Sequence, residues 1–218
     1  MTRYFCLSIV FATMLFSSCD MEQRKITSEA LKDERKSREI KQVKEGEILN
    51  AALQTGREVS RISQQELIAT LQLAIEAHGV PGAVTFCNVE ALSLMDSLST
   101  ATKSRIRRVS QRYRNPKDEP NELEANLLDA YAYSVEQNEA PGDNIQMLDN
   151  GKILYTKPIL LGAELCLNCH GTKSEISPET QSQINELYPQ DKATGYQIGQ
   201  LRGMWSIELD KTEIIKNM

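Results

Sequence analysis

The segment 166–170, Cys-Leu-Asn-Cys-His, constrains this chain more than any other feature, because it sets two thiols one helical turn apart beside one of only two histidines. Three chemical uses fit a CxxCH segment. A thioredoxin-like redox pair needs a βαβ setting, whereas a predicted β-hairpin precedes the motif here. A zinc site needs four protein ligands. The sequence has no second CxxC or HxxxH, so Cys87 or His78 would have to complete that set.

Covalent haem is the use that the segment favours. C-x-x-C-H is the attachment signature of c-type haem, and each residue type has a role in it. The thiols of Cys166 and Cys169 add to the haem vinyl groups as thioethers, and a neutral nitrogen of His170 binds the iron. The sequence therefore predicts one haem c, with the redox pair and the zinc site as alternatives.

The N-terminus predicts export. Arg3 is the only charge before a strongly apolar run, and residues 1–18 have the pattern of a signal peptide. The run is too short for a membrane-spanning helix, which needs roughly 20 apolar residues. The sequence ending at Cys19 resembles a bacterial lipobox, although Phe16 stands where that motif usually has Leu. We expect a protein lipid-anchored through Cys19 on the periplasmic side of a bacterial membrane; an ordinary signal peptide is the alternative.

The charge balance gives no support to nucleic acid as a partner. The net charge is −5, and cleavage after residue 18 would remove Arg3 and leave about −6, whereas nucleic-acid binding needs a basic surface. Residues 19–47 are mostly charged and read as a solvated tether. Residues 48–218 then form one domain, long enough to bury a cofactor-sized core.

The periodicity of residues 48–218 predicts an α+β fold, with N-terminal helices packed on an antiparallel sheet that the CxxCH segment interrupts. Gly79 and Pro81 end the first helical run, and the pair Asn150-Gly151 marks a β-hairpin. The expected helices cover residues 48–75, 82–102 and 121–138. The expected strands cover residues 104–114, 144–149, 152–160 and 201–209, followed by a short tail, 210–218.

The second axial ligand of the iron is open from the residues alone. A methionine, Met147 or Met204, would give an electron carrier of raised potential. His78 stands where a helix ends, which is more typical of a partner for the helix dipole. Cys87 is a lone thiol in an apolar helix, and it lacks a disulfide partner once the CxxCH thiols hold haem; its alternative is a buried small apolar residue. The remaining candidates for the second axial position are a tyrosine or no ligand at all.

Four segments resemble a bacterial family of c-type haem sensor domains with a PAS-like fold: GAVTFCNVEA, RRVSQRYRNPKDEP, CLNCHG and QLRGMWSIEL. The resemblance covers about residues 48–210. It implies that His170 and Cys87 are the axial ligands and that Cys166 and Cys169 are the covalent anchors. It also implies redox or gas sensing, since members occur both as free-standing exported proteins and as the sensing part of signalling proteins.

Arginines are the candidates for binding the haem propionates, because their guanidinium groups bind carboxylates bidentately. Five of them stand between residues 105 and 114, and we select Arg108, Arg112 and Arg114. The alternative is a solvated basic face. Trp205 and Tyr113 are expected in the core or the pocket wall.

We therefore expect a redox or diatomic-gas sensor. A thiolate ligand stabilises ferric iron and lowers its potential, and its release on reduction would open a site for CO or NO. The alternative is a periplasmic electron-transfer cytochrome. An enzyme is not expected, although peroxidase-like activity stays an alternative that would use His78. Expected partners are the membrane, a redox or signalling protein and a small gas; the apolar stripe at 48–75 would form a homodimer or cover the sheet.

Overall fold

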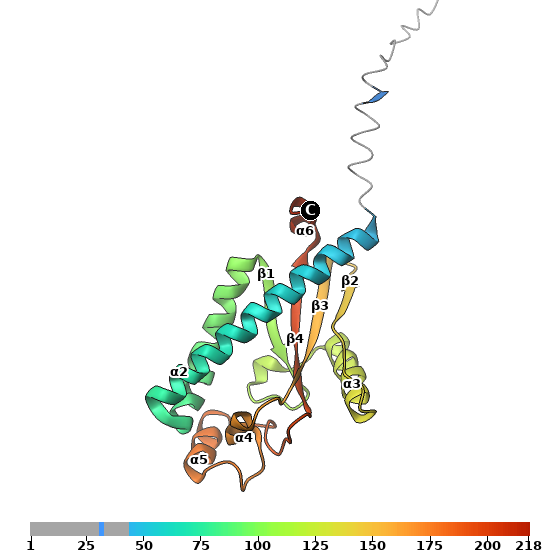
Figure 1. The fold of residues 1–218 in the computed structure, drawn as a ribbon. Helices are drawn as coiled ribbons and strands as arrows, with labels where there is room; N and C mark the ends of the chain where they lie inside the picture. Colours follow the sequence, from blue (N-terminus) through green and yellow to red (C-terminus); the bar gives the residue numbers. More distant parts are fainter. Residues whose placement is uncertain (1–30, 33–43) are drawn as a thin grey trace, which may run out of the picture. The chain divides into compact units, whose positions relative to one another are not determined.

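A computed structural model describes residues 31–32 and 44–218 (Figure 1). The predictions for the signal peptide, Cys19 and most of the tether lie outside the described residues. The described residues 44–218 belong to a single unit. Its helices are α2 (Glu45–Thr102), η1 (Pro116–Asp118), α3 (Glu122–Glu136), α4 (Glu164–His170), α5 (Pro178–Leu187) and α6 (Lys211–Lys216), and its strands are β1 (Ser104–Val109), β2 (Asn144–Met147), β3 (Lys152–Leu160) and β4 (Leu201–Asp210).

The four strands form one antiparallel sheet in the order β1-β4-β3-β2. The last strand, β4, lies between the first strand and the predicted hairpin of β2 and β3. The connection from β3 to β4 leaves the sheet and carries α4, which holds the CxxCH segment, and α5. The predicted α+β class and the interruption of the sheet by this segment are confirmed.

Helix α2 consists of two arms that meet at Gly79. The backbone there is non-helical, with φ 70° and ψ 176°, a conformation that glycine adopts without strain. This confirms the break predicted from Gly79 and Pro81. The first arm crosses one face of the sheet, and the second returns to β1 (Figure 1). One 18-residue window of α2 is apolar enough to span a membrane by length and composition alone, with a mean hydropathy of 1.3, and 11% of that window is buried.

The main core lies between the first arm of α2 and the sheet. Alternate residues of each strand point to this face: Ile153 and Tyr155 of β3 and Trp205 and Ile207 of β4 are buried there. The Trp205 indole Nε1 donates to the Gln64 side chain at 3.0 Å, so this residue lies in the core as predicted. Buried residues shared by the opposite face and α3 form a second cluster: Val109, Leu128, Tyr131 and Met204.

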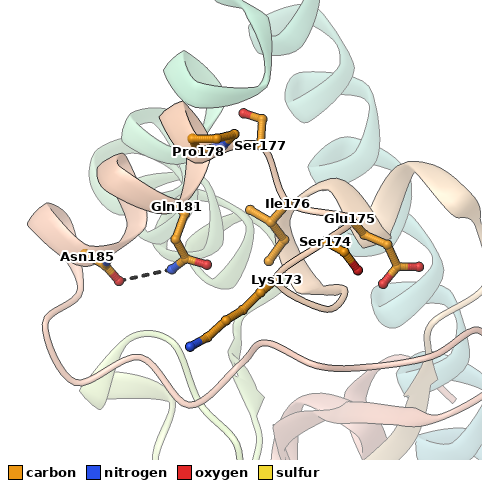
Figure 2. A pocket seen from close by; sticks show the side chains of 8 residues that line it. All are labelled: Lys173, Ser174, Glu175, Ile176, Ser177, Pro178, Gln181 and Asn185. Carbon is orange, nitrogen blue, oxygen red and sulfur yellow. Dashed lines mark hydrogen bonds between the residues drawn. The ribbon is translucent and has the colours of Figure 1, made fainter.

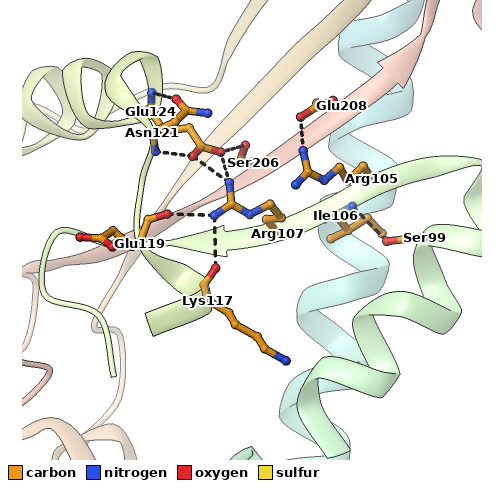
Figure 3. A network of polar contacts seen from close by, with 10 residues as sticks. All are labelled: Ser99, Arg105, Ile106, Arg107, Lys117, Glu119, Asn121, Glu124, Ser206 and Glu208. Carbon is orange, nitrogen blue, oxygen red and sulfur yellow. Dashed lines mark hydrogen bonds and ion pairs between the residues drawn. The ribbon is translucent and has the colours of Figure 1, made fainter. Parts of the chain in front are cut away.

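A buried carboxylate joins α3 to the sheet. Glu124 is 3% exposed, accepts hydrogen bonds from Arg107 at 2.9 Å and from Ser206 at 2.6 Å, and closes the capping box of α3 with Asn121 (Figure 3). Because the ion pair is also hydrogen-bonded, its burial is compensated. Arg107 is therefore held on the α3 face of the sheet by its ion pair with Glu124.

The sequence predicted the strand near residue 104 too long, and the expected helices did not include η1, α4, α5 or α6. Strand β1 ends at Val109, because the Ser110 amide donates to the carbonyl of Asp118 at 3.1 Å and no longer to β4. Arg112 and Arg114 therefore lie in a loop. Helix α5 was not predicted, and α6 occupies most of the predicted tail.

The close packing of α2 on β3 predicts a strong effect of substitution at Gly56. A Cβ atom there would overlap the ring of Tyr155, so Gly56→Ala is expected to lower the free energy of unfolding by about 1–3 kcal/mol in urea titrations. Gly46→Ala is the matched control, because nothing lies within 4 Å of the added atom; it should raise stability by up to about 1 kcal/mol. Equal effects of the two changes would contradict this packing.

Candidate functional site

The CxxCH segment forms one short helix, α4, that packs against α2 and α5 near the bend of the α2 hairpin (Figure 1). Cys169 packs against a cluster formed by Val84 of α2 with Ile176, Ile184 and Tyr188. Cys166 packs against a second cluster, formed by Leu161, Ala193 and Tyr196. The two thiols are half-buried and free, and the helix places them one turn apart.

His170 is held as a neutral imidazole. Its Nδ1 lies 2.8 Å from the carbonyl oxygen of Ala193, which fixes Nδ1 as the donor and leaves Nε2 with its lone pair. Burial lowers the pKa of His170 well below its ordinary value, and the charges of Arg202 and Arg114 lower it further. The ring therefore stays uncharged at neutral pH, which is the form that binds a metal.

Arg114 anchors the CxxCH segment from the loop after β1. Its guanidinium forms an ion pair with Asp191 at 3.0 Å and donates to the carbonyl of Cys169 at 2.6 Å. The side chains of both ion-pair partners are about nine-tenths buried. The segment is further paired with residues 195–196, since the Gly195 and Tyr196 amides donate to the carbonyls of Gly171 and His170.

Cys87 lies in the second arm of α2 and faces this segment. Its thiol is half-buried and close enough to Cys169 that a charge on Cys87 raises the pKa of Cys169. Burial raises the pKa of Cys87 itself, and the neighbouring Arg108 and Arg114 oppose this rise. The structure thus brings Cys87 together with the CxxCH helix.

The other candidate ligands lie elsewhere. His78 is exposed at the end of the first α2 arm. Met147 packs against the main core, and Met204 is fully buried in the cluster under α3. Among the described residues, no group of three or more His, Cys, Asp or Glu side chains is arranged to hold a metal ion, so the zinc alternative gains no support there.

The three candidate arginines, Arg108, Arg112 and Arg114, differ in how far their side chains already contact other groups of the protein. Arg114 is engaged as described, and Arg112 stacks on the Tyr196 ring at 3.9 Å and donates to the carbonyl of Thr194. Arg108 points to the α2 face and has no ion pair with any residue in the described part of the chain. Its donors remain available to a ligand. Tyr113 is buried in the wall of this region, under the ammonium of Lys192.

Arg202 is a site residue that the sequence reading missed. It lies near the start of β4, and its charge acts on His170. Its Nε is buried without a hydrogen-bond partner in the described part of the chain. The sequence carried no signal that set Arg202 apart, because β4 also contains Ser206, Glu208 and Asp210.

Two cavities open on the domain, and the first of them borders the segment that follows the CxxCH helix. One, of about 720 Å³, surrounds the start of α5 (Figure 2). Its lining is mainly polar and includes Lys173, Ser177 and Gln181 but none of the three thiols. The other, of about 310 Å³, lies between the second arm of α2, β1 and η1 and is lined in part by Arg108 and Asp118. Neither was predicted from the sequence.

The donor set fits a covalently attached haem. Two thiols one turn apart and an imidazole with a free Nε2 supply anchors and an axial ligand, and the facing thiol of Cys87 supplies a second one. The half-buried guanidinium of Arg202, whose buried Nε has no hydrogen bond among the described residues, supplies a partner for an acidic group. The fold and the site define the class: an α+β protein whose CxxCH helix docks against a cysteine on a helical hairpin.

A family model described as Tll0287-like matches residues 22–209, so the chain belongs to the Tll0287-like family. This confirms the family resemblance inferred from the sequence. Among solved structures, the crystal structure of the cyanobacterial heme-protein Tll0287 is similar, with 24% sequence identity and a TM-score of 0.49 over 71% of this chain and 95% of that chain. No curated protein matches.

Removing the anchor of the CxxCH segment should destabilise the protein. Arg114→Ala leaves the Asp191 carboxylate buried and unpaired, so we expect a loss of about 3–5 kcal/mol in unfolding free energy. Hydrogen exchange at the Gly195 and Tyr196 amides should also become faster. Arg105→Ala removes an exposed ion pair with Glu208 and should cost less than about 1 kcal/mol. A loss no larger for Arg114→Ala than for this control would contradict the assignment.

Proposed function

We propose that this protein is a haem c protein with one haem attached through Cys166 and Cys169 and ligated by His170 and Cys87. The observation that carries the proposal is the position of α4, which brings the CxxCH segment against the cysteine of the α2 hairpin. Family membership agrees, because Tll0287, whose name the family carries, is described as a cyanobacterial heme-protein.

The site residues divide the work of holding this group. Ala193 fixes the His170 ring through Nδ1, and Arg114 fixes the backbone at Cys169. Arg108 retains donors for a propionate, as expected from the sequence. Arg112 and Arg114 already donate to protein groups, so fewer of their donors are left for a propionate. A bound haem supplies one-electron redox chemistry and a binding site for diatomic gases.

Within this class we infer a redox or gas sensor. Burial raises the pKa of the Cys87 thiol, so a sulfur released from a metal would take up a proton and stay neutral. This favours exchange of the Cys87 ligand over permanent ligation. A periplasmic electron-transfer cytochrome is the second candidate. In such a protein Cys87 would stay bound to the iron in both oxidation states. The one other histidine, His78, is exposed, which supports a non-enzymatic role.

The N-terminal sequence supports a location for this function. We infer lipidation at Cys19 and anchoring on the periplasmic side of a bacterial membrane, with residues 19–47 as the tether. A redox or signalling protein would then be the partner. The acidic net charge of −5 argues against nucleic acid. Homodimerisation through the apolar stripe at 48–75 stays a prediction.

Covalent attachment is tested by mass. In a host with the haem-attachment machinery, the purified protein should be coloured and heavier by one haem after denaturation, because thioether bonds survive unfolding. The double variant Cys166→Ser/Cys169→Ser should lose this mass. Cys87→Ser should keep it and serves as the matched control. A colourless wild-type protein would refute the proposed function.

The axial role of Cys87 is tested by absorption spectra. Cys87→Ala should change the ferric spectrum strongly, because it removes the thiolate, whereas His78→Ala should leave it as in the wild type. For a sensor, adding CO to the reduced wild-type protein should shift the Soret band. A reduced spectrum that ignores CO would favour the electron carrier, and an unchanged Cys87→Ala spectrum would remove Cys87 from the ligand set.

A further inference from the structure

Arg202 is a half-buried arginine whose guanidinium has no anionic partner among the described residues. Its Nε has no hydrogen bond, and its one side-chain bond runs from Nη1 to the carbonyl oxygen of Arg112 at 3.3 Å. In the described part of the chain no carboxylate lies within ion-pair distance of it. The Tyr196 ring lies 5.5 Å from the guanidinium carbon, at the limit of a favourable cation–π contact.

The neighbouring arginines show what is missing at Arg202. Arg105, Arg107 and Arg114 each pair with a carboxylate, from Glu208, Glu124 and Asp191 respectively. Removing a guanidinium from water without an anion costs several kcal/mol. Burial accordingly lowers the pKa of Arg202.

The charges around Arg202 come from several elements. Arg108 on β1 and Arg114 on the following loop add two more positive charges, while Asp118 on η1 and Tyr196 before β4 act in the opposite sense. Burial raises the pKa of Asp118, which weakens it as a counter-ion. Burial is the largest cause of the lowered pKa of His170, the last residue of the CxxCH helix, and the charges of Arg202, Arg114 and Arg108 lower it further. An anion that enters here is attracted to the edge of that helix.

We propose that Arg202 is the main carboxylate-binding residue of this site and pairs with a propionate of the haem held by α4. The proposal rests on the proposed function, because the carboxylate comes from the attached group. It adds a residue to the site that lies outside the arginines at 105–114. A free organic acid offers the same chemistry, and the test separates the two sources.

The test compares Arg202→Gln, Arg202→Lys and the control Arg105→Gln in two forms of the full chain, with haem and as the Cys166→Ser/Cys169→Ser variant. Arg202→Gln should lower the unfolding midpoint of the haem-loaded form by about 4 °C or more, because it leaves the propionate unpaired. It should raise the midpoint of the haem-free form, because it removes an uncompensated charge. Arg202→Lys should retain most of the stability of the haem-loaded form. The control Arg105→Gln should shift the unfolding midpoints of both forms by the same amount.

Shifts of the unfolding midpoint in opposite directions in the two forms would identify the pairing. If Arg202 had a purely structural role, Arg202→Gln would shift both midpoints in the same direction, and that result would overturn the proposal. Should the haem-free form not fold, the reduction potential of the loaded form decides. It should vary with pH in Arg202→Gln between about pH 5 and 8, where an unpaired propionate takes up a proton, and not in the wild type. The same pH dependence in both would overturn the pairing.

Acetate distinguishes the source of the carboxylate. The midpoint of the loaded wild-type protein should not respond to acetate, because the propionate occupies the guanidinium. A rise with acetate that Arg202→Gln abolishes would identify a free anion and overturn the proposal. Failure of the proposed function is recognised separately, since it appears as the absence of haem from every variant.

Discussion

The buried ion pair between Arg114 and Asp191 is the contact on which the site depends. One guanidinium ties the loop after β1 to the carbonyl of Cys169 and to the segment around Asp191. The carbonyl of Ala193, two residues further on, then meets Nδ1 of His170. The orientation of the imidazole is therefore set by a side chain from a distant part of the sequence, which is how outer partners usually orient a metal ligand.

The second constraint is the bend in α2. Gly79 reverses the helix, so that the second arm carries Cys87 back along the sheet to β1. The first arm is fixed by the close approach of Gly56 to Tyr155. The two segments that carry the thiols are far apart in the chain. They meet because the hairpin of α2 packs on the sheet and carries Cys87, while the connection from β3 to β4 leaves the sheet and carries the CxxCH helix α4.

The sequence was most informative where local chemistry is specific. Asn150-Gly151 placed the hairpin of β2 and β3, and Gly79 placed the bend of α2, because both positions require backbone conformations that few residues adopt. Helix α5 was missed because it buries only Thr180 and Ile184, too few to produce a helical apolar pattern. Its start signal, Ser177 followed by Pro178, was present in the sequence.

At the site, the motif alone identified Cys166, Cys169 and His170, because their spacing is a chemical requirement. Cys87 was one alternative among several until the family resemblance selected it, since the facing of α2 and α4 is a tertiary fact. Arg202 could not be selected from the sequence. Its significance lies in the lack of a partner, which only the packed structure reveals.

The central claim is that a thiolate and an imidazole from these two helices hold one iron. X-ray absorption at the iron edge of the ferric, haem-loaded wild-type protein tests it most directly, because it counts the atoms bound to the metal. The account predicts one sulfur and five nitrogens in the first shell. A shell of nitrogen and oxygen alone would contradict it.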